Sequence, residues 1–299
     1  MAGLVACSEE AAESPGRSGA GGMSGKPVVH VVNYPLQYFA GRIAGDAVEV
    51  VFPAPANVDP AHWMPDRKAI QAFQKADLVL LNGAGYAKWL DKVSLPQSKL
   101  VDTSSAFRGQ LMKVKDVVTH SHGKGGEHSH VGTASHTWLN PRLATLQAEA
   151  IRDAFSRLAP EKVAAFAGAF EALKRDLMEL DADMDVIIKQ DRDRPIVFSH
   201  PVYQYFQRRF AVNSRSLHWE PEEVPGVEEW GKLDKLRTSH AFTAVIWEAP
   251  PAERTKARLK SLGVESQVFN PCANVPATGD FLSVMKRNAD ALKAVYIAR

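Results

Sequence analysis

Short apolar runs alternate with helical patterns along most of the chain from Pro27 onward. Four such runs in the first part of the chain predict strands: Val28–Asn33, Val48–Phe52, Leu78–Leu81 and Lys99–Val101. Between them, apolar residues recur at helical spacing over Leu36–Ile43 and Arg67–Ala76. Strands that alternate with helices are typical of βαβ units and of a parallel sheet. The first part of the chain is therefore predicted to form a compact α/β lobe.

A second alternating block begins at Pro195. Its predicted strands are three buried runs: Ile196–Ser199, Ala244–Trp247 and Ser266–Phe269. Helical patterns cover Pro251–Ser261 and the closing segment Asp280–Ala298. This block predicts a second α/β lobe.

The middle of the chain has no strand pattern. Apolar residues recur there every three or four positions: Phe166, Phe170, Leu173, Leu177, Leu180 and Met184. This spacing places them on one face of a long helix that starts near Val163, and Pro160 suits its N-terminal end. The fold class is therefore α/β, with two parallel-sheet lobes joined by one long rigid helix. The expected boundaries are 27–141 for the N-terminal lobe, 142–194 for the linking helices and 195–299 for the C-terminal lobe.

Composition agrees with a globular protein and excludes some functions. The chain has 299 residues, of which 45% are hydrophobic and 23% charged, enough to bury a large core. The net charge is only +2 and no basic stripe is present, which argues against nucleic-acid binding. No apolar stretch approaches the roughly 20 residues that a membrane-spanning helix needs.

The two cysteines indicate a lipid anchor rather than a thiolate metal site. Cys7 and Cys272 are far apart and form no CxxC pair. The segment 4–8 resembles a bacterial lipobox, and 8–26 is a polar, small-residue stretch suited to a flexible tether. We expect 1–26 to be a lipobox remnant and tether, with the natural start upstream or the sequence truncated, because no signal peptide precedes Cys7. The alternative is a chance stretch before a free cysteine. Cys272 is then a buried free thiol.

Histidines are the most informative residues of the chain. Four of the ten fall within eleven positions of a glycine-rich, polar loop over 119–135: His120, His122, His128 and His130. Such a tract cannot pack a core, and solvated imidazoles bind borderline metals such as zinc weakly. The alternative is a loop whose histidines have no role.

Further candidate ligands follow the predicted strands. His200 directly follows a strand of the second lobe, as do Glu248 and Asn270. His136 follows the histidine-rich loop, and His62 lies several residues after the second strand. In open α/β sheets, ligands bind beyond the carboxyl ends of strands. Three neutral imidazoles with one oxygen suit tetrahedral Zn²⁺, whereas Mn²⁺ favours more carboxylate and water.

Several motifs together carry a family resemblance. They are Tyr34-Pro35-Leu36, Asn82–Tyr86 with Trp89-Leu90, His136–Pro141, Ser199-His200-Pro201 with Tyr205-Phe206, and Glu220-Pro221. In this order the chain, from about Pro27 to its end, resembles the zinc and manganese solute-binding proteins of ABC importers. The histidine-rich insertion resembles the variable loop of the zinc-selective members. The resemblance implies a metal held in the cleft between two lobes and delivered to an ABC permease, by a monomer.

The resemblance also implies a ligand set. His136 and His200 correspond to the family's second and third ligands. The first ligand is expected at His62, although the histidine is displaced by one residue from the family's Asp-Pro-His motif. His30 is the reserve candidate, with a packed strand residue as the alternative reading.

The fourth ligand is less defined by the resemblance. The family often has an aspartate where this chain has Asn270. Glu248 is the expected substitute, and water is the alternative. A hydrogen bond from Glu248 to a cleft loop is the competing structural role.

The predicted function is zinc capture in the periplasm or cell envelope, without catalysis. No HExxH or GxSxG motif is present. Two alternatives remain open: a zinc-dependent hydrolase with Glu248 as general base, and a lipid-anchored metal buffer without a permease. Histidine ligands bind metal only when neutral, so affinity is expected to fall as the pH drops through about 6.5.

Overall fold

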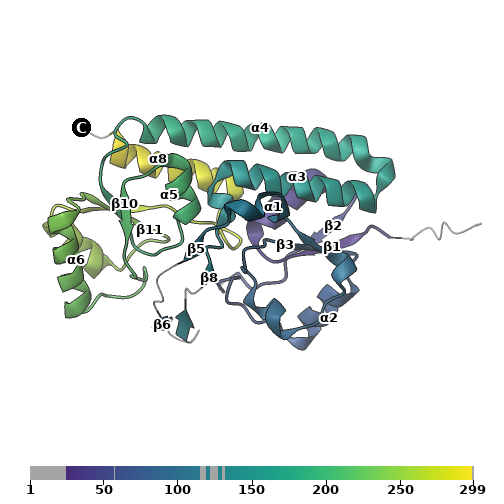
Figure 1. The fold of residues 1–299 in the computed structure, drawn as a ribbon, viewed down its shortest axis with the longest axis horizontal. Helices are drawn as coiled ribbons and strands as arrows, with labels where there is room; N and C mark the ends of the chain where they lie inside the picture. The colour runs from purple at the N-terminus through teal and green to yellow at the C-terminus, as the bar shows by residue number, and fades with distance from the viewer. Residues whose placement is uncertain (1–24, 57, 115–118, 122–126, 130–131, 298–299) are drawn as a thin grey trace, which may run out of the picture.

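The computed structural model describes residues 25–56, 58–114, 119–121, 127–129 and 132–297 (Figure 1). They form two α/β lobes that lie side by side along one long helix. The predicted fold class is confirmed. No helix in the described part of the chain has the length and apolar character needed to cross a membrane.

The N-terminal lobe is built on a four-stranded sheet in the order β2-β1-β3-β4. Its strands are β1 (Val28–Val31), β2 (Glu49–Val51), β3 (Leu78–Leu81) and β4 (Leu100–Asp102), and every pair is parallel. Its helices are α1 (Tyr34–Ala44) and α2 (Arg67–Lys75). Each helix begins at a side-chain cap, Asn33 for α1 and Asp66 for α2. All four strands and both helices were predicted, with ends within two residues.

The C-terminal lobe has a second parallel sheet in the order β10-β9-β11-β12. Its strands are β9 (Ile196–Phe198), β10 (Ser214–Ser216), β11 (Ala244–Trp247) and β12 (Glu265–Val268). Its helices are α5 (Gln204–Phe210), α6 (Val227–Ser239), α7 (Glu253–Ser261) and α8 (Phe281–Tyr296). In both lobes the second strand along the chain lies at the sheet edge, beside the first. The two sheets therefore share one strand order, although the sequence contains no visible repeat.

Two helices connect the lobes, α3 (Pro141–Leu158) and α4 (Val163–Ile188). The 26 residues of α4 make a rod about 39 Å long at 1.5 Å per residue. The six apolar residues that predicted this helix are all buried. Figure 1 shows α4 along one side of both lobes, with α3 and α8 beneath it. The predicted long helix is confirmed.

A buried carboxylate ties α4 to both neighbouring segments. Asp181 of α4 accepts a hydrogen bond from Arg142 Nε of α3 at 3.1 Å and from Arg209 Nε of α5 at 2.7 Å. Its side chain is only 3% exposed, against 14% for Arg209 and 59% for Arg142. One anion thus links a helix of each lobe to the rod.

A loop of the C-terminal lobe, residues 270–275, reaches into the N-terminal lobe. It makes three interlobe hydrogen bonds: Tyr34 N to Ala273 O (3.0 Å), Trp138 Nε1 to Pro271 O (2.7 Å) and Asn274 Nδ2 to Pro55 O (2.7 Å). Cys272 in this loop is a buried free thiol, as predicted. The lobes are therefore fixed to each other on this side by the loop and by α4.

The remaining described elements are short. They are β5 (Lys113–Val114), β6 (Thr119–Ser121), β7 (Glu127–Ser129), β8 (Gly132–Thr133), and the 3-10 helices η1 (Lys88–Lys92), η2 (Gln97–Lys99), η3 (Ser105–Gln110), η5 (Thr137–Leu139) and η6 (Pro160–Lys162). β6 and β7 pair as an antiparallel hairpin with His120 opposite His128. His122, His130, Cys7 and most of the expected tether lie outside the described residues.

Candidate metal centre

His200 lies where β9 ends, at the junction with the edge of β11. Ser199 N donates to Ile246 O at 2.8 Å, so the chain leaves the sheet just before this histidine. The His200 side chain is 7% exposed. Its Nδ1 lies 2.8 Å from Oε1 of Glu248, and its Nε2 lies 3.6 Å from Oε1 of Glu220. One buried imidazole is therefore flanked by two carboxylates.

The two glutamates come from loops that are fixed to each other. Beyond β10, Trp219 N donates to Ser199 O at 2.8 Å, which brings the next residue, Glu220, beside His200. Ala252 N donates to Pro221 O at 2.7 Å and so ties the loop after β11 to the Glu220 loop. The Trp219 ring packs against two buried tryptophans, Trp230 and Trp247. Glu220 is 14% exposed and Glu248 is 25% exposed.

His136 belongs to the N-terminal lobe and directly precedes η5. Asn82, the first residue after β3, donates from Nδ2 to Ser135 O at 2.9 Å. Asn33 in turn donates to Asn82 Oδ1 at 3.1 Å, so the end of β1 orients the residue that holds the His136 backbone. The imidazole packs against Trp138, with ring centroids 4.8 Å apart. The conserved-looking Asn82 motif thus acts by positioning His136.

Gly83 completes this support. Its φ of 72° lies in the left-handed region, and a Cβ at this position would lie 1.9 Å from Ser104 Oγ. Only glycine fits both the backbone angle and the close approach of the β4 loop.

Electrostatics connect the two lobes at this place. Burial lowers the pKa of His136 below its usual 6.5; Asp59 and Glu248 raise it, and His200 lowers it further. The burial effect is the largest, so His136 is neutral at pH 7 and able to bind a metal. Because Glu248 and His200 belong to the other lobe, the charges of both lobes act on one imidazole.

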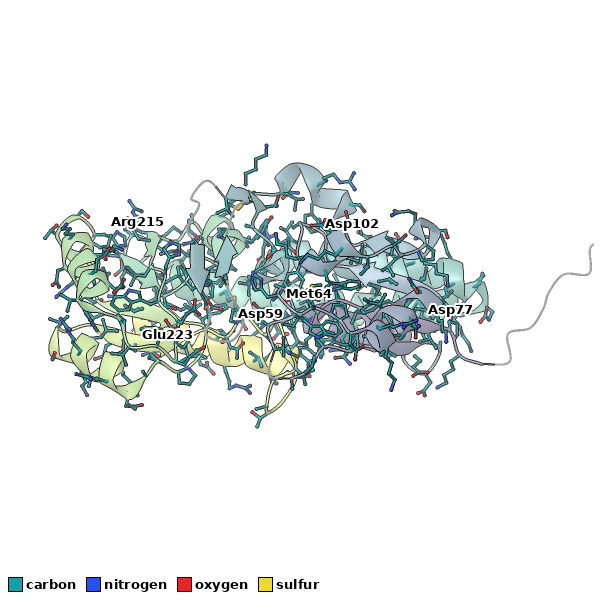
Figure 2. All side chains as sticks on the ribbon, turned by 90° about the horizontal axis from the view of Figure 1, so that it is seen from below. Asp59, Met64, Asp77, Asp102, Arg215 and Glu223 are labelled. Atoms are coloured by element: carbon teal, nitrogen blue, oxygen red, sulfur yellow. The ribbon has the colours of Figure 1, made fainter. Side chains whose placement is uncertain are left out.

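His62 lies in a turn beside this group. Its backbone N and that of Trp63 both donate to Asp59 O, and its Nε2 lies 3.8 Å from Asp59 Oδ2. The imidazole is 27% exposed. Figure 2 shows Asp59 and Met64 near the middle of the molecule, between Glu223 of one lobe and Asp77 of the other. The structure therefore brings the His62 turn to the side of His136 through Asp59.

Two reserve candidates lie elsewhere. His30 is buried within β1, with its ring 5.0 Å from that of Phe73 of α2, and burial lowers its pKa. It is a packed strand residue. Asn270 is exposed, and its Oδ1 accepts from Cys272 N at 2.7 Å. That side chain holds the backbone of its own loop.

The candidate ligands form two half-sites. Within the described residues, no three side chains of histidine, cysteine, aspartate or glutamate are close enough to hold a metal ion together. His136 and the His62 turn form the half-site of one lobe, and His200 with its two glutamates forms the other. Coordination of one ion by both therefore requires side-chain movement.

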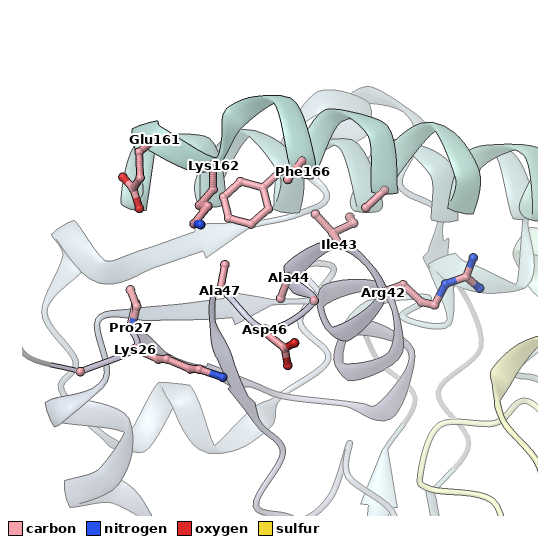
Figure 3. A pocket seen from close by; sticks show the side chains of 14 residues that line it. Lys26, Pro27, Arg42, Ile43, Ala44, Asp46, Ala47, Glu161, Lys162 and Phe166 are labelled. Atoms are coloured by element: carbon pink, nitrogen blue, oxygen red, sulfur yellow. The ribbon is translucent and has the colours of Figure 1, made fainter.

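Two hollows were compared with this place. One of about 780 Å³ lies between the end of α1 and the start of α4; Lys26, Asp46, Glu161 and Lys162 mix both charge signs on its wall (Figure 3). Neither histidine nor cysteine lines it. The other, of about 360 Å³, lies beside the half-site of the C-terminal lobe. Its polar lining is His218, Glu220, Glu223 and Glu229.

Sequence reasoning missed three residues of this neighbourhood. Glu220 was noted only as part of a motif, His218 was not considered, and Asp59 was noted only as part of the His62 motif. The His218 and His200 rings are 6.3 Å apart. An alternating His-Trp-Glu pattern after a strand, with the tryptophan buried, was the signal available for His218 and Glu220.

Comparisons with known proteins identify the family. The sequence profile of the family described as "ZnuA: Zinc-uptake complex component A periplasmic" matches residues 29–295. The chain belongs to the ZnuA family. The two lobes and the linking helix are the fold that the resemblance implied.

Similar proteins include two curated zinc proteins. This ZnuA-family chain is 25% identical to the zinc-binding lipoprotein AdcA of Streptococcus pneumoniae over 97% of its own length and 58% of that protein. It is 24% identical to the high-affinity zinc uptake system protein ZnuA of Bacillus subtilis, over 89% of its own length and 86% of that protein. The chain thus spans somewhat more than half the length of the AdcA relatives that it matches.

Solved structures show the same fold. The metal-dependent lipoprotein YcdH of Bacillus subtilis aligns with a TM-score of 0.78 at 21% identity, covering 91% of this chain and all of that one. Zn(II)-bound AdcA of Streptococcus pneumoniae aligns with a TM-score of 0.75 at 23% identity, covering 91% of this chain and 58% of that one.

Proposed function

We propose that this chain captures Zn²⁺ outside the cytoplasm and delivers it to an ABC importer. The observation that carries the proposal is the meeting of His136 and His200, one from each lobe, where Glu248 acts on both imidazoles. The zinc-binding relatives and the Zn(II)-bound structures of the same fold support zinc as the cargo.

The proposed ligands are His62, His136 and His200, with a carboxylate of the C-terminal half-site, Glu248 or its neighbour Glu220. Neutral imidazole and carboxylate suit Zn²⁺, and a set rich in nitrogen disfavours Mn²⁺. Two nearby carboxylates also compensate the charge of a buried divalent cation. Zinc binding replaces the repulsion between these anions with attraction, which favours capture.

The proposed partner is an ABC permease, since the family is described as part of a zinc-uptake complex. We further propose a monomer with residues 1–26 as a tether, lipid-anchored through Cys7, and lobes at 27–141 and 195–299 joined by 142–194. The relatives named lipoproteins support the anchor. The family is one of solute-binding receptors, which supports binding without turnover.

The test is a calorimetric zinc titration of metal-free protein at pH 7. We expect one tight site in the unmodified protein and its loss in the double variant His136→Ala/His200→Ala. His30→Val is the matched control, because it removes a histidine that packs against Phe73, away from both half-sites. Tight binding that survives in the double variant would place the metal elsewhere and refute the proposal.

A further inference from the structure

We infer that Glu220 is the oxygen ligand of the captured zinc and that Glu248 orients His200 without binding the ion. This inference rests on the proposed function and assigns the fourth ligand within the same site. It differs from the ligand set expected from the sequence, in which Glu248 supplied the oxygen.

The proton on His200 decides which nitrogen faces the metal. Nδ1 lies 2.8 Å from a carboxylate oxygen of Glu248. Two acceptor atoms repel each other at that separation, so Nδ1 carries the proton of the neutral ring. The lone pair is then on Nε2. Carboxylates commonly hold the distal nitrogen of a metal-binding histidine in this way, fixing tautomer and ring orientation.

The distance on the other side of the ring fits two ligands of one ion. Bonds of about 2.0–2.2 Å in tetrahedral geometry place two ligand atoms about 3.4 Å apart. His200 Nε2 and Glu220 Oε1 are 3.6 Å apart. A zinc ion between them therefore needs little movement of either side chain.

The fold positions Glu220 for this role. Both sheets have the same strand order, with β2 and β10 as equivalent edge strands. His62 follows β2 and Glu220 follows β10, so the equivalent loop of each lobe supplies one candidate ligand. The Trp219–Ser199 and Ala252–Pro221 backbone hydrogen bonds hold the Glu220 loop against the His200 loop. The carboxylate is thus delivered by a fixed backbone.

The other oxygen candidates fit less well. Asn270 is exposed and its side-chain oxygen already accepts from Cys272 N. Glu248 has one oxygen engaged beside Nδ1, on the side of the imidazole that faces away from the lone pair. Binding the same ion as Nε2 would require Glu248 to abandon that contact.

The experiment compares Glu220→Gln with Glu248→Gln, using Glu223→Gln as the control from the same loop, where Glu223 is exposed. Zinc affinity is measured by chelator competition, and ligand geometry by the visible absorption of bound Co²⁺. We expect Glu220→Gln to weaken zinc binding by about 1,000-fold and to change the Co²⁺ spectrum. Glu248→Gln is expected to weaken it by about 10- to 100-fold, the usual effect of losing an orienting partner, with the tetrahedral spectrum retained.

The outcomes separate this inference from the proposed function. Glu220→Gln with unmodified affinity and spectrum, beside a changed spectrum in Glu248→Gln, overturns the inference and makes Glu248 the ligand. If the unmodified protein binds no zinc, the proposed function itself fails. A fold defect would appear as a lowered unfolding temperature of the metal-free variant, and Glu220→Asp, which keeps the carboxylate, then serves in its place: a Co²⁺ spectrum retained by Glu220→Asp and lost by Glu220→Gln supports the inference.

Discussion

Replacing Asp181 with asparagine should strongly destabilise the metal-free protein. The carboxylate is 3% exposed and accepts from Arg142 and Arg209, which lie on segments of different lobes. Without the anion, Arg209 remains 14% exposed with only the more distant Asp185, at 3.9 Å, among its printed ion-pair partners. A buried guanidinium loses much of its compensation.

The magnitude follows from the exposure of the two arginines. Removing one partner of a buried ion pair costs about 3–5 kcal/mol. Arg142 is 59% exposed and recovers water, so its share is small. The expected loss is therefore at the lower end, about 3 kcal/mol. Asp176, on the same helix, pairs with Arg42 while both are more than a third exposed, so Asp176→Asn should cost under about 1 kcal/mol.

The assay is urea unfolding of both metal-free variants at pH 7, followed by circular dichroism and tryptophan fluorescence. Losses of equal size in Asp181→Asn and Asp176→Asn would refute the reasoning. The double variant Asp181→Asn/Arg209→Met provides a second check. It should be more stable than Asp181→Asn alone, because it also removes the uncompensated charge.

Two further predictions concern pH and thiol reactivity. Burial lowers the pKa of both His30 and His136, so below about pH 6.5 the unfolded chain binds protons that the folded protein refuses, and stability falls with the pH. Urea midpoints between pH 5 and 8 should show this slope, and it should be shallower in His30→Val; an unchanged slope contradicts the assignment. Burial raises the pKa of Cys272 to about 12, so a thiol reagent at pH 8 should label it only after denaturation. Labelling of the native protein at the rate seen in urea would contradict that burial.

Much of the fold was predictable because its buried strands and helices carry strong apolar periodicity. β10 was missed because Ser214–Ser216 is polar, and an edge strand covered on one side needs no apolar run. The linking helix was found because its buried residues repeat over six turns. Periodicity therefore found what the core requires and missed what only pairing requires.

The site was predictable only in part. His136 and His200 stood out because each follows a recognisable motif, and the structure brings their charges together. Glu220 could not be assigned, because its approach to His200 depends on the backbone hydrogen bond between Trp219 and Ser199. The tautomer of His200 likewise depends on a contact with a residue 48 positions away. Such roles arise from tertiary contacts that leave no local pattern.

The loop 270–275 has a consequence for how this protein signals that it is loaded. Each of its interlobe hydrogen bonds ends on a backbone carbonyl, and together with α4 they hold the lobes as one body. A rigid hinge of this kind excludes a wide clamshell motion on metal binding. A membrane partner must then recognise the occupied state from small rearrangements of surface loops, such as the turn that carries His62, rather than from a change of overall shape.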